Sequence, residues 1–233
     1  MGDIDTFMIF LTDLKKHRDL ILQRGSVKHI KTKDTLFHFR NMWVHVMYKQ
    51  DSDMELRTID IPGEYNFGFF VIADRSGQKI YLIGGQGTPS RILKFNVENK
   101  TFEELPSKLI VPRRGGHMCG LIPNTNKIMI TGGKYDSSRS TEIFDTENES
   151  ITLAGEMNFE RKDHGIGVLT INDQDRLAVF GGVYDLFGSI KDSLRSVELY
   201  DAQNNIWEIS STIKMQKVRS DFGFKSFKQS EIL

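Results

Sequence analysis

A pair of glycines closes a short apolar run three times in this chain, and this repetition constrains the fold more than any other feature. The runs are Ile80–Gly85, Ile128–Gly133 and Leu177–Gly182, so the unit recurs every 48–49 residues. A fixed period of this length predicts a repeat architecture, in which similar units stack on one another. Glycine at the end of a strand indicates a positive φ angle or a close approach of two backbones.

A second signature follows each glycine pair and describes a tight turn. It begins with an aromatic residue, continues with Asn or Asp, has Asn at its fifth place and a large apolar residue seven positions after the first. The three copies are Phe95–Phe102, Phe144–Ile151 and Tyr200–Trp207. Asn and Asp favour tight turns, so the two large residues lie on the arms of a hairpin and can face one neighbouring sheet. Four short strands in a unit near 50 residues predict an all-β propeller blade.

The order of these features resembles the kelch repeat, in which an arginine followed by histidine or glycine precedes the glycine pair. A Glu-x-(Tyr/Phe)-Asp strand then follows. The matching segments are Arg114–His117, Arg161–Gly165, Arg219–Gly223, Glu142–Asp145 and Glu198–Asp201. The first copy departs from the pattern, and we interpret Lys94 as standing at its glutamate position. The resemblance covers residues 62–224 and implies a kelch-type β-propeller.

We expect about three complete four-stranded blades, over residues 62–106, 107–157 and 158–211. Residues 42–61 are expected to form a part blade and 218–228 the first strand of a further blade, so the propeller domain spans 42–233. Closed propellers have roughly 4–8 blades. The alternatives are a small four-bladed ring, a fragment, an open arc, or half of a dimer. Open sheet edges would favour self-association.

The first 41 residues differ from the repeats and are expected to form a helical or irregular extension. Apolar residues in Ile4–Arg24 follow roughly helical spacing, and Gly25 is a natural helix end. Short strands at Val27–Ile30 and Leu36–Phe39 could extend the array instead. Kelch-type ubiquitin-ligase adaptors normally carry a BTB domain, which 41 residues are too short to hold. Residues 15–33 contain seven basic residues and one acid, which we interpret as a solvated face.

Charge and composition exclude several classes of function. Lys+Arg and Asp+Glu both number 31, so the net charge is zero and general nucleic-acid binding is disfavoured. No apolar run approaches the ~20 residues of a membrane span, and the start lacks the features of a secretion signal. Cys119 is the single cysteine, which excludes a disulfide within the chain. We therefore expect a cytoplasmic protein that binds neither nucleic acid nor membranes.

No catalytic, cofactor-binding or metal-binding residues are predicted. None of the six histidines shows the paired spacing of a metal site. His117 and His164 occupy the same place in successive repeats, which indicates a structural role. The alternative from another class is a propeller enzyme, such as a kelch-type sugar epimerase or oxidase, and a third is an incomplete remnant that binds nothing.

We expect the loops to bind a protein or an acidic peptide, because loops on a rigid scaffold usually carry binding. By the kelch resemblance, the function would be substrate recognition for a cullin-type ubiquitin ligase or actin binding. In adaptors of this type that capture acidic peptides, arginines before each blade line the pocket. The candidate partner-binding residues are Arg114, Arg161, Arg219, Lys134, Tyr135, Arg139, Tyr184, Leu186 and Phe187. Alternatively, the arginines pair with Glu142 or Glu198, or hydrogen-bond to carbonyls between blades.

Overall fold

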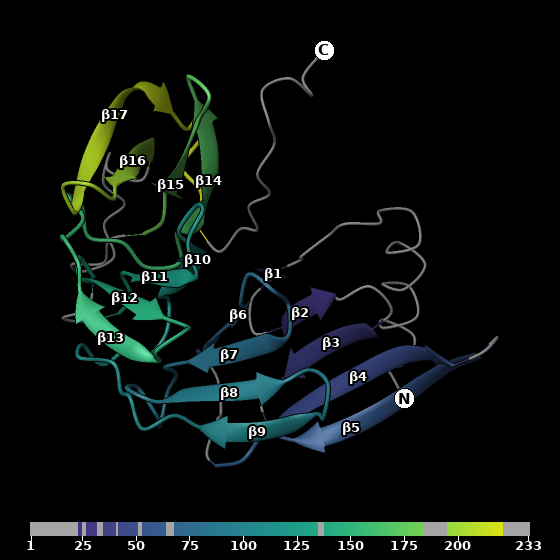
Figure 1. Ribbon diagram of the computed structural model, residues 1–233. Coiled ribbons are helices and arrows are strands. Elements are labelled where there is room, and N and C mark those ends of the chain that lie inside the picture. The colour runs from purple at the N-terminus through teal and green to yellow at the C-terminus, as the bar shows by residue number, and fades with distance from the viewer. Residues whose placement is uncertain are drawn as a thin grey trace.

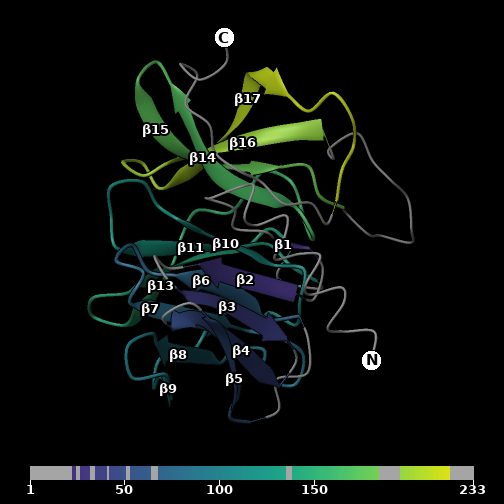
Figure 2. The same cartoon turned by 90° about the vertical axis from the view of Figure 1, so that its right-hand side faces the viewer.

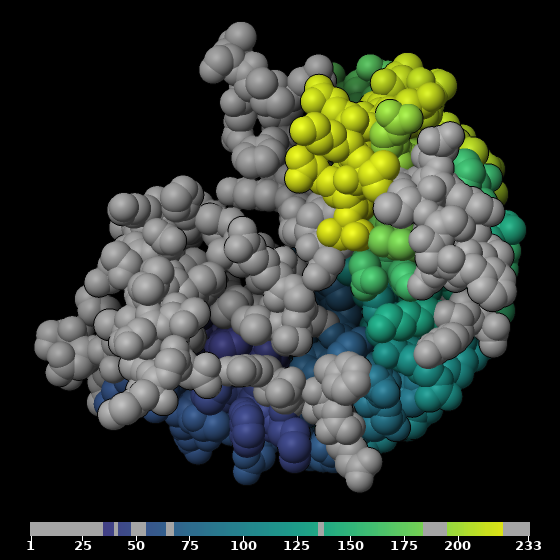
Figure 3. All heavy atoms as spheres, turned by 180° about the vertical axis from the view of Figure 1, so that it is seen from behind, coloured from purple at the N-terminus to yellow at the C-terminus, as the bar shows by residue number. Residues whose placement is uncertain are grey.

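The computed structural model shows an arc of four antiparallel β-sheets (Figure 1). It describes residues 23–24, 27–31, 35–40, 42–50, 53–63, 68–134, 138–183 and 195–220. In the space-filling view of Figure 3, the colour follows the arc from purple through teal to yellow. Within the described ranges no helix is long and apolar enough to cross a membrane. The prediction of an all-β architecture built from four-stranded antiparallel sheets is confirmed.

The first sheet has five strands in sequence order. They are β1 (Gln23–Arg24), β2 (Val27–Lys31), β3 (Thr35–Arg40), β4 (Trp43–Gln50) and β5 (Asp53–Asp60). The sheet is therefore wider than the part blade expected over 42–61, because the segment before residue 42 contributes three strands to it.

The boundary predicted for the N-terminal extension, at residue 41, is wrong, because strands β1–β3 lie before it. The alternative of short strands at Val27–Ile30 and Leu36–Phe39 is correct, since β2 and β3 pair with each other. The helix expected over Ile4–Arg24 falls almost wholly outside the described residues, and its last two residues form β1. The further strand expected over 218–228 also lies largely outside them.

The other three sheets each have four strands, as expected for three complete blades. The first comprises β6 (Phe70–Ala73), β7 (Lys79–Ile83), β8 (Ile92–Asn96) and β9 (Thr101–Glu104). The second comprises β10 (Met118–Leu121), β11 (Lys127–Thr131), β12 (Thr141–Asp145) and β13 (Ser150–Leu153). The third comprises β14 (Gly165–Ile171), β15 (Gln174–Phe180), β16 (Ser196–Asp201) and β17 (Ile206–Lys214).

Strands β2, β6, β10 and β14 are neighbours along the inside of the arc. Contacts run from β2 to β6, from β6 to β10 and from β10 to β14. In Figure 2 the sheet β14–β17 lies at one end of this stack. Strands β7 and β11 are buried along almost their whole length, because a neighbouring sheet covers each of their faces.

The paired large residues of the turn signature fill the cores between sheets. Phe95 and Phe102 have ring centres 4.8 Å apart and pack against Phe37 and Phe39 of the first sheet. Tyr200 and Trp207 are 5.2 Å apart and form the equivalent contact two blades later. Each hairpin therefore packs its two large residues on the preceding sheet, as the spacing predicted.

The polar residues of the same signature hold the turn itself. The Asn96 side chain accepts hydrogen bonds from the backbone amides of Glu98 and Asn99, and Asp145 and Asp201 do the same in their turns. The backbone is left-handed at the residue that follows the Asn at the fifth place of the signature. Its φ angles are 58°, 56° and 55° at Lys100, Glu149 and Asn205.

The glycine pairs show both features predicted for them, a positive φ angle and a close approach of a second backbone segment. Gly84, Gly132 and Gly181 have φ angles of 63°, 59° and 54°. A Cβ atom at Gly132 would overlap the carbonyl oxygen of Arg161 and crowd the ring of His164. Glycine is needed here because the backbone of the next blade lies directly against the pair.

We expect Gly132→Ala to destabilise the fold by clearly more than the ~1–2 kcal/mol that a left-handed backbone alone costs. Urea unfolding of the full chain measures the loss. Gly77→Ala is the matched control, because Gly77 has a φ of 72° and open space around its Cβ position. Equal losses in the two variants would contradict the close-approach explanation.

Candidate functional site

The glycine pairs meet the segments that lead into the next blade, and together they form one face of the array. The amide of the second glycine donates a hydrogen bond to an arginine carbonyl in each case. Gly85 reaches Arg113 at 2.8 Å, and the next two junctions join Gly133 to Arg161 and Gly182 to Arg219, both at 2.9 Å. We call Arg113, Arg161 and Arg219 the leading arginines and this side of the array the glycine face.

The Arg113 side chain turns inward and binds its own blade. Its Nε and Nη2 donate to one carboxylate oxygen of Glu142 at 3.1 and 2.8 Å. Its Nη1 donates to the carbonyl of Gly132 at 2.5 Å. Both charged side chains are fully buried. Glu142 also accepts from the amide of Ile110 at 2.6 Å, so the pair ties the leading segment, the glycine pair and strand β12 together.

Arg161 repeats this arrangement in the next blade. Its Nε and Nη2 donate to Glu198 at 3.1 and 3.0 Å, and its Nη1 donates to the carbonyl of Gly181 at 2.5 Å. Glu198 also accepts from the amide of Asn158 at 2.6 Å. Burial lowers the pKa of the Arg161 guanidinium while Glu198 opposes the change, and arginine remains charged. We call each arginine with its glutamate a buried brace.

The structure corrects the alignment of the first two repeats. Arg113, one residue before the expected Arg114, is the equivalent of Arg161. The reason is one additional residue before the histidine, which follows its leading arginine by four positions in this blade and by three in the next. The sequence pattern alone could not choose between two adjacent arginines.

Lys94 does not occupy the glutamate position of the first repeat. Leu93 does, because it pairs with Leu82 where Glu142 pairs with Ile130 in the next blade. Leu93 is buried in the core beside Phe95. Lys94 instead forms ion pairs of 2.8 Å with Glu103 and 2.7 Å with Glu149 of the next blade.

The two recurring histidines lie under the glycine pairs. His117 Nε2 is 3.0 Å from the carbonyl of Ile83, and His164 Nε2 is 2.8 Å from the hydroxyl of Thr131. Both rings are buried. Burial, reinforced by the charge of Arg161, holds the pKa of His164 well below its ordinary value of 6.5. These histidines join one blade to the next, which agrees with the structural role inferred from their recurrence.

The predicted partner-binding residues separate into buried, exposed and undescribed groups. Arg161 is buried in its brace, which corresponds to the second alternative that the sequence left open. Arg114, Lys134, Arg139 and Arg219 are exposed. Tyr135, Tyr184, Leu186 and Phe187 lie outside the described residues.

The backbone brings three exposed basic residues and the half-buried Lys162 together in two couples on the glycine face. The amide of Lys134 donates to the carbonyl of Gly115 at 3.0 Å, which places Lys134 beside Arg114. Val183 and Lys162 exchange two backbone hydrogen bonds while the preceding Gly182 binds Arg219. Lys162 therefore joins Arg219, although the sequence did not single it out. We call Arg114, Lys134, Lys162 and Arg219 the basic rim.

Arg139 differs from the basic rim because its side chain already has partners in its own blade. Its Nε donates to the carbonyl of Met157 at 3.0 Å, and its Nη2 is 3.5 Å from Glu156. It therefore already supports the segment that leads into the next blade. Its predicted role in partner binding, like that of the basic rim, stays a prediction.

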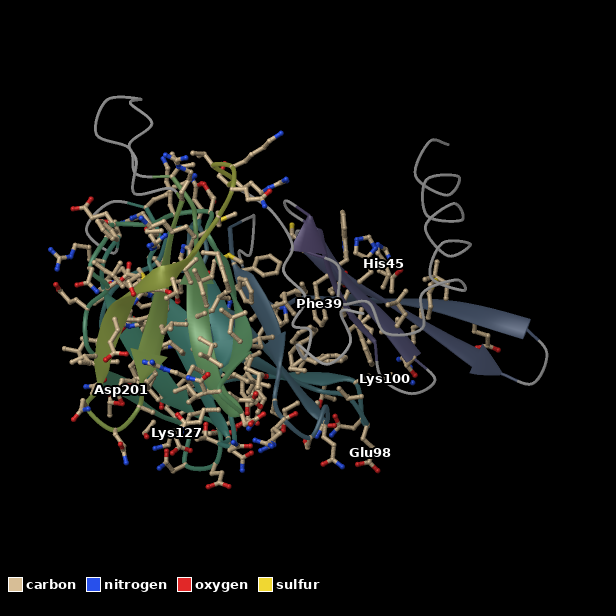
Figure 4. All side chains as sticks on the ribbon, turned by 90° about the horizontal axis from the view of Figure 1, so that it is seen from above. Phe39, His45, Glu98, Lys100, Lys127 and Asp201 are labelled. Atoms are coloured by element: carbon tan, nitrogen blue, oxygen red, sulfur yellow. The ribbon has the colours of Figure 1, made fainter. Side chains whose placement is uncertain are left out.

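The face opposite the glycine face carries a polar hollow on the last described blade. The hollow is lined by Asp173, Asp175 and Asp201, and by Arg176, whose Nη2 is 2.7 Å from Glu208. Figure 4 labels Asp201 and Lys127 at this end. Among the described side chains, no group of three or more His, Cys, Asp or Glu residues is arranged to hold a metal ion.

Comparisons with known proteins agree with the repeat assignment. The chain is 28% identical over 156 residues to a RING finger domain and kelch repeat-containing protein of Dictyostelium discoideum. It is 29% identical over 157 residues to a kelch repeat-containing protein of the same organism. The matches cover 66% and 65% of this chain but only 15% and 22% of these relatives. No protein-family model matches the chain.

The fold is also found among solved structures. The structure of YjhT, a kelch-type propeller, superposes with a TM-score of 0.64 at 15% sequence identity. The match covers 85% of this chain and 67% of YjhT. These findings confirm the resemblance to kelch repeats that the sequence suggested.

We expect Arg161→Ala to destabilise the fold by about 3–5 kcal/mol, because it leaves the Glu198 carboxylate buried without its partner. Arg114→Ala, at an exposed arginine in the segment that leads into the previous blade, is the control and should change the free energy of unfolding by less than about 0.5 kcal/mol. Chemical denaturation measures both. The double variant Arg161→Met with Glu198→Leu should recover much of the loss. A single-variant loss as small as that of Arg114→Ala would refute the brace.

We expect stability to fall in mild acid because of His164. Its folded pKa is lowered, so its contribution is complete above the unfolded value near 6.5 and is lost as the pH falls below that value. The slope is up to ~1.4 kcal/mol per pH unit until the folded ring itself protonates. Denaturation at pH 7.5, 6.5 and 5.5 measures this slope. His164→Gln should flatten it, and an unchanged slope in that variant would exclude His164 as the cause.

Proposed function

We propose that this chain, whose repeats are of the kelch type, is a protein-interaction module that captures an acidic polypeptide segment on its basic rim. The observation that carries the proposal is that two adjacent arginines differ in burial and in their contacts. The Arg113 side chain is buried and bound to Glu142 in the brace of its blade. Arg114, the next residue, is exposed on the glycine face.

The basic rim is suited to carboxylates by its position and chemistry. No ion pair of Arg114 or Arg219 is found within the described part of the chain. Arg114 adjoins Lys134, and Arg219 adjoins Lys162, through the backbone hydrogen bonds of the glycine face. Guanidinium groups bind carboxylates with two parallel hydrogen bonds, so such couples favour Asp- and Glu-containing segments. The buried braces hold the underlying backbone rigid, which reduces the entropy lost on binding.

As a finer proposal, the acidic segment belongs to a particular class of protein. One relative carries a RING finger domain together with kelch repeats by its name. This combination supports the hypothesis that the captured segment belongs to a substrate of a ubiquitin ligase. The present chain spans 15% of that relative's length, so the proposal concerns only recognition by the repeats.

Peptide display against the full chain tests the interaction. Peptides rich in Asp and Glu should be enriched, and their affinity should fall as salt concentration rises. The double variant Arg114→Glu with Arg219→Glu should weaken the selected peptides at least tenfold while the melting temperature stays nearly unchanged.

Arg75→Glu is the matched control for this experiment. Arg75 is exposed in the turn between β6 and β7, at the end of the array opposite the glycine face, and its reversal alters the net charge in the same direction. The selected peptides should bind this variant as tightly as the parent chain. Equal weakening by both changes would indicate a general charge effect and refute the basic rim as the site.

A further inference from the structure

The outer edge of the first sheet is formed by β5, which lies at the rim of the array (Figure 1). Strand β5 spans eight residues, and its register with β4 is unbroken from the Trp43–Asp60 pair to the Gln50–Asp53 pair. Within the described ranges, β4 is its only strand partner. The outward-facing N–H and C=O groups of β5 therefore offer a template on which a further strand can pair.

The outer edges of the other three sheets are shorter or interrupted. Strands β9 and β13 have four residues each. Strand β17 has nine, but its register with β16 shifts between Ser196 and Glu198, as at a β-bulge. Short strands, bulges, proline and lysine are the usual devices that protect a sheet edge from pairing. Strand β5 is long and regular, and its sequence contains neither proline nor lysine, so it is the edge best suited to strand addition.

The side chains along β5 form a pattern that is complementary to itself. They are exposed from Glu55 to Thr58. Leu56 is 59% exposed, and no large hydrophobic residue in the described ranges is more exposed. Glu55 and Arg57 flank it, and both lie on the opposite face of the strand because side chains alternate. One face thus presents an exposed leucine, and the other presents two opposite charges.

Backbone geometry limits the registers in which two copies of β5 can pair. Opposite residues of an antiparallel pair either exchange both backbone hydrogen bonds or exchange none. The N–H and C=O groups of a strand point outward at every second residue, so opposite residues must both be even-numbered or both be odd-numbered. For two identical strands related by a two-fold axis, the axis then lies at one residue and not between two.

Electrostatics selects one of these registers. With the axis at Leu56, the two leucines are opposite each other, and Glu55 of each copy is opposite Arg57 of the other. An axis at Glu55 or at Arg57 would place two like charges directly opposite each other, which is destabilising. An axis at Thr58 would place Arg57 opposite Ile59 and form no ion pair. Only the register centred on Leu56 therefore combines an apolar contact with two ion pairs.

We propose that β5 pairs antiparallel with β5 of a second copy of this chain, with Leu56 at the two-fold axis. The pairing joins two first sheets into one continuous sheet and covers both open edges. Glu55 also interacts within its own chain, and a carboxylate has about four lone-pair positions with which to accept from both partners. The contact involves one strand of each copy, so the dimer is weak and depends on concentration. No basic-rim residue takes part, so the dimer and the proposed function fail or stand separately.

Sedimentation equilibrium of the full chain over a wide range of concentrations tests the dimer. Leu56→Lys should weaken self-association at least tenfold, because it places two ammonium groups opposite each other. Leu153→Lys is the matched control, since Leu153 is 58% exposed on the short edge strand β13. Its dimer should be as stable as that of the parent chain. Equal weakening by the two changes would overturn the assignment to β5.

A charge exchange tests the register. Arg57→Glu should weaken the dimer at least tenfold, because two pairs of like charges then face each other. Adding Glu55→Arg restores opposite charges in the register centred on Leu56, so the double variant should dimerise nearly as well as the parent chain. A double variant that dimerises as poorly as Arg57→Glu alone would overturn this register.

Disulfide formation measures the same register directly. The Cα atoms of opposite residues are about 4.5–5.5 Å apart, which is within the ~4.4–6.8 Å range of disulfides. Leu56→Cys should therefore cross-link two copies under mild oxidation. In Thr58→Cys the two cysteines are four residues apart along the strands, roughly 13 Å, and should not cross-link. The native Cys119 is buried and common to both variants. Equal cross-linking of the two variants would overturn the register.

Hydrogen exchange on the unmodified chain keeps the proposal testable if a variant fails to fold. Alternate amides of β5 should exchange more slowly as the concentration of the chain rises, whereas those of β9 and β13 should not change. The alternative occupant of this edge is an extended segment of another protein. In that case the purified chain stays monomeric at every concentration and exchange at β5 stays constant, and either result would overturn the proposal.

Discussion

The buried pair of guanidinium and carboxylate is the interaction on which the repeated unit depends. Removing two charges from water is costly, and only a complete set of hydrogen bonds offsets that cost. Arg113 obtains it from Glu142 and from the carbonyl of Gly132. Arginine, glutamate and the glycine pair therefore occur together in the repeat. In the blade where Leu93 replaces the glutamate, apolar packing takes over the same position.

The braces also explain how one segment can serve both structure and recognition. Two adjacent arginines precede β10, and their environments differ completely. Arg113 is fully buried, whereas Arg114 is exposed. A strand-leading segment that is anchored by one side chain can present the next one in a fixed direction, because the backbone between them has little freedom. The binding hypothesis rests on this fixed presentation rather than on the number of basic residues.

Local patterns predicted most of the blade architecture, because glycine pairs and Asn- or Asp-based turns are set by neighbouring residues. Features that depend on pairing between strands were harder to predict. The choice between Arg113 and Arg114 required the contact with Gly85, and the position of Leu93 required its register with Leu82. The first sheet lacks a glycine pair, so its early strands were predicted only as the alternative to a helical or irregular extension.

The two peptide groups of a glycine pair connect neighbouring braces in series. The Gly132 carbonyl accepts from Arg113, and the Gly133 amide donates to the carbonyl of Arg161, whose side chain enters the next brace. Two consecutive residues thus hold the leading segments of two neighbouring blades in a fixed relation to each other. Arg114 and Lys134 directly follow Arg113 and Gly133 in the chain, so the backbone contacts that join consecutive blades also fix the positions of these two rim residues.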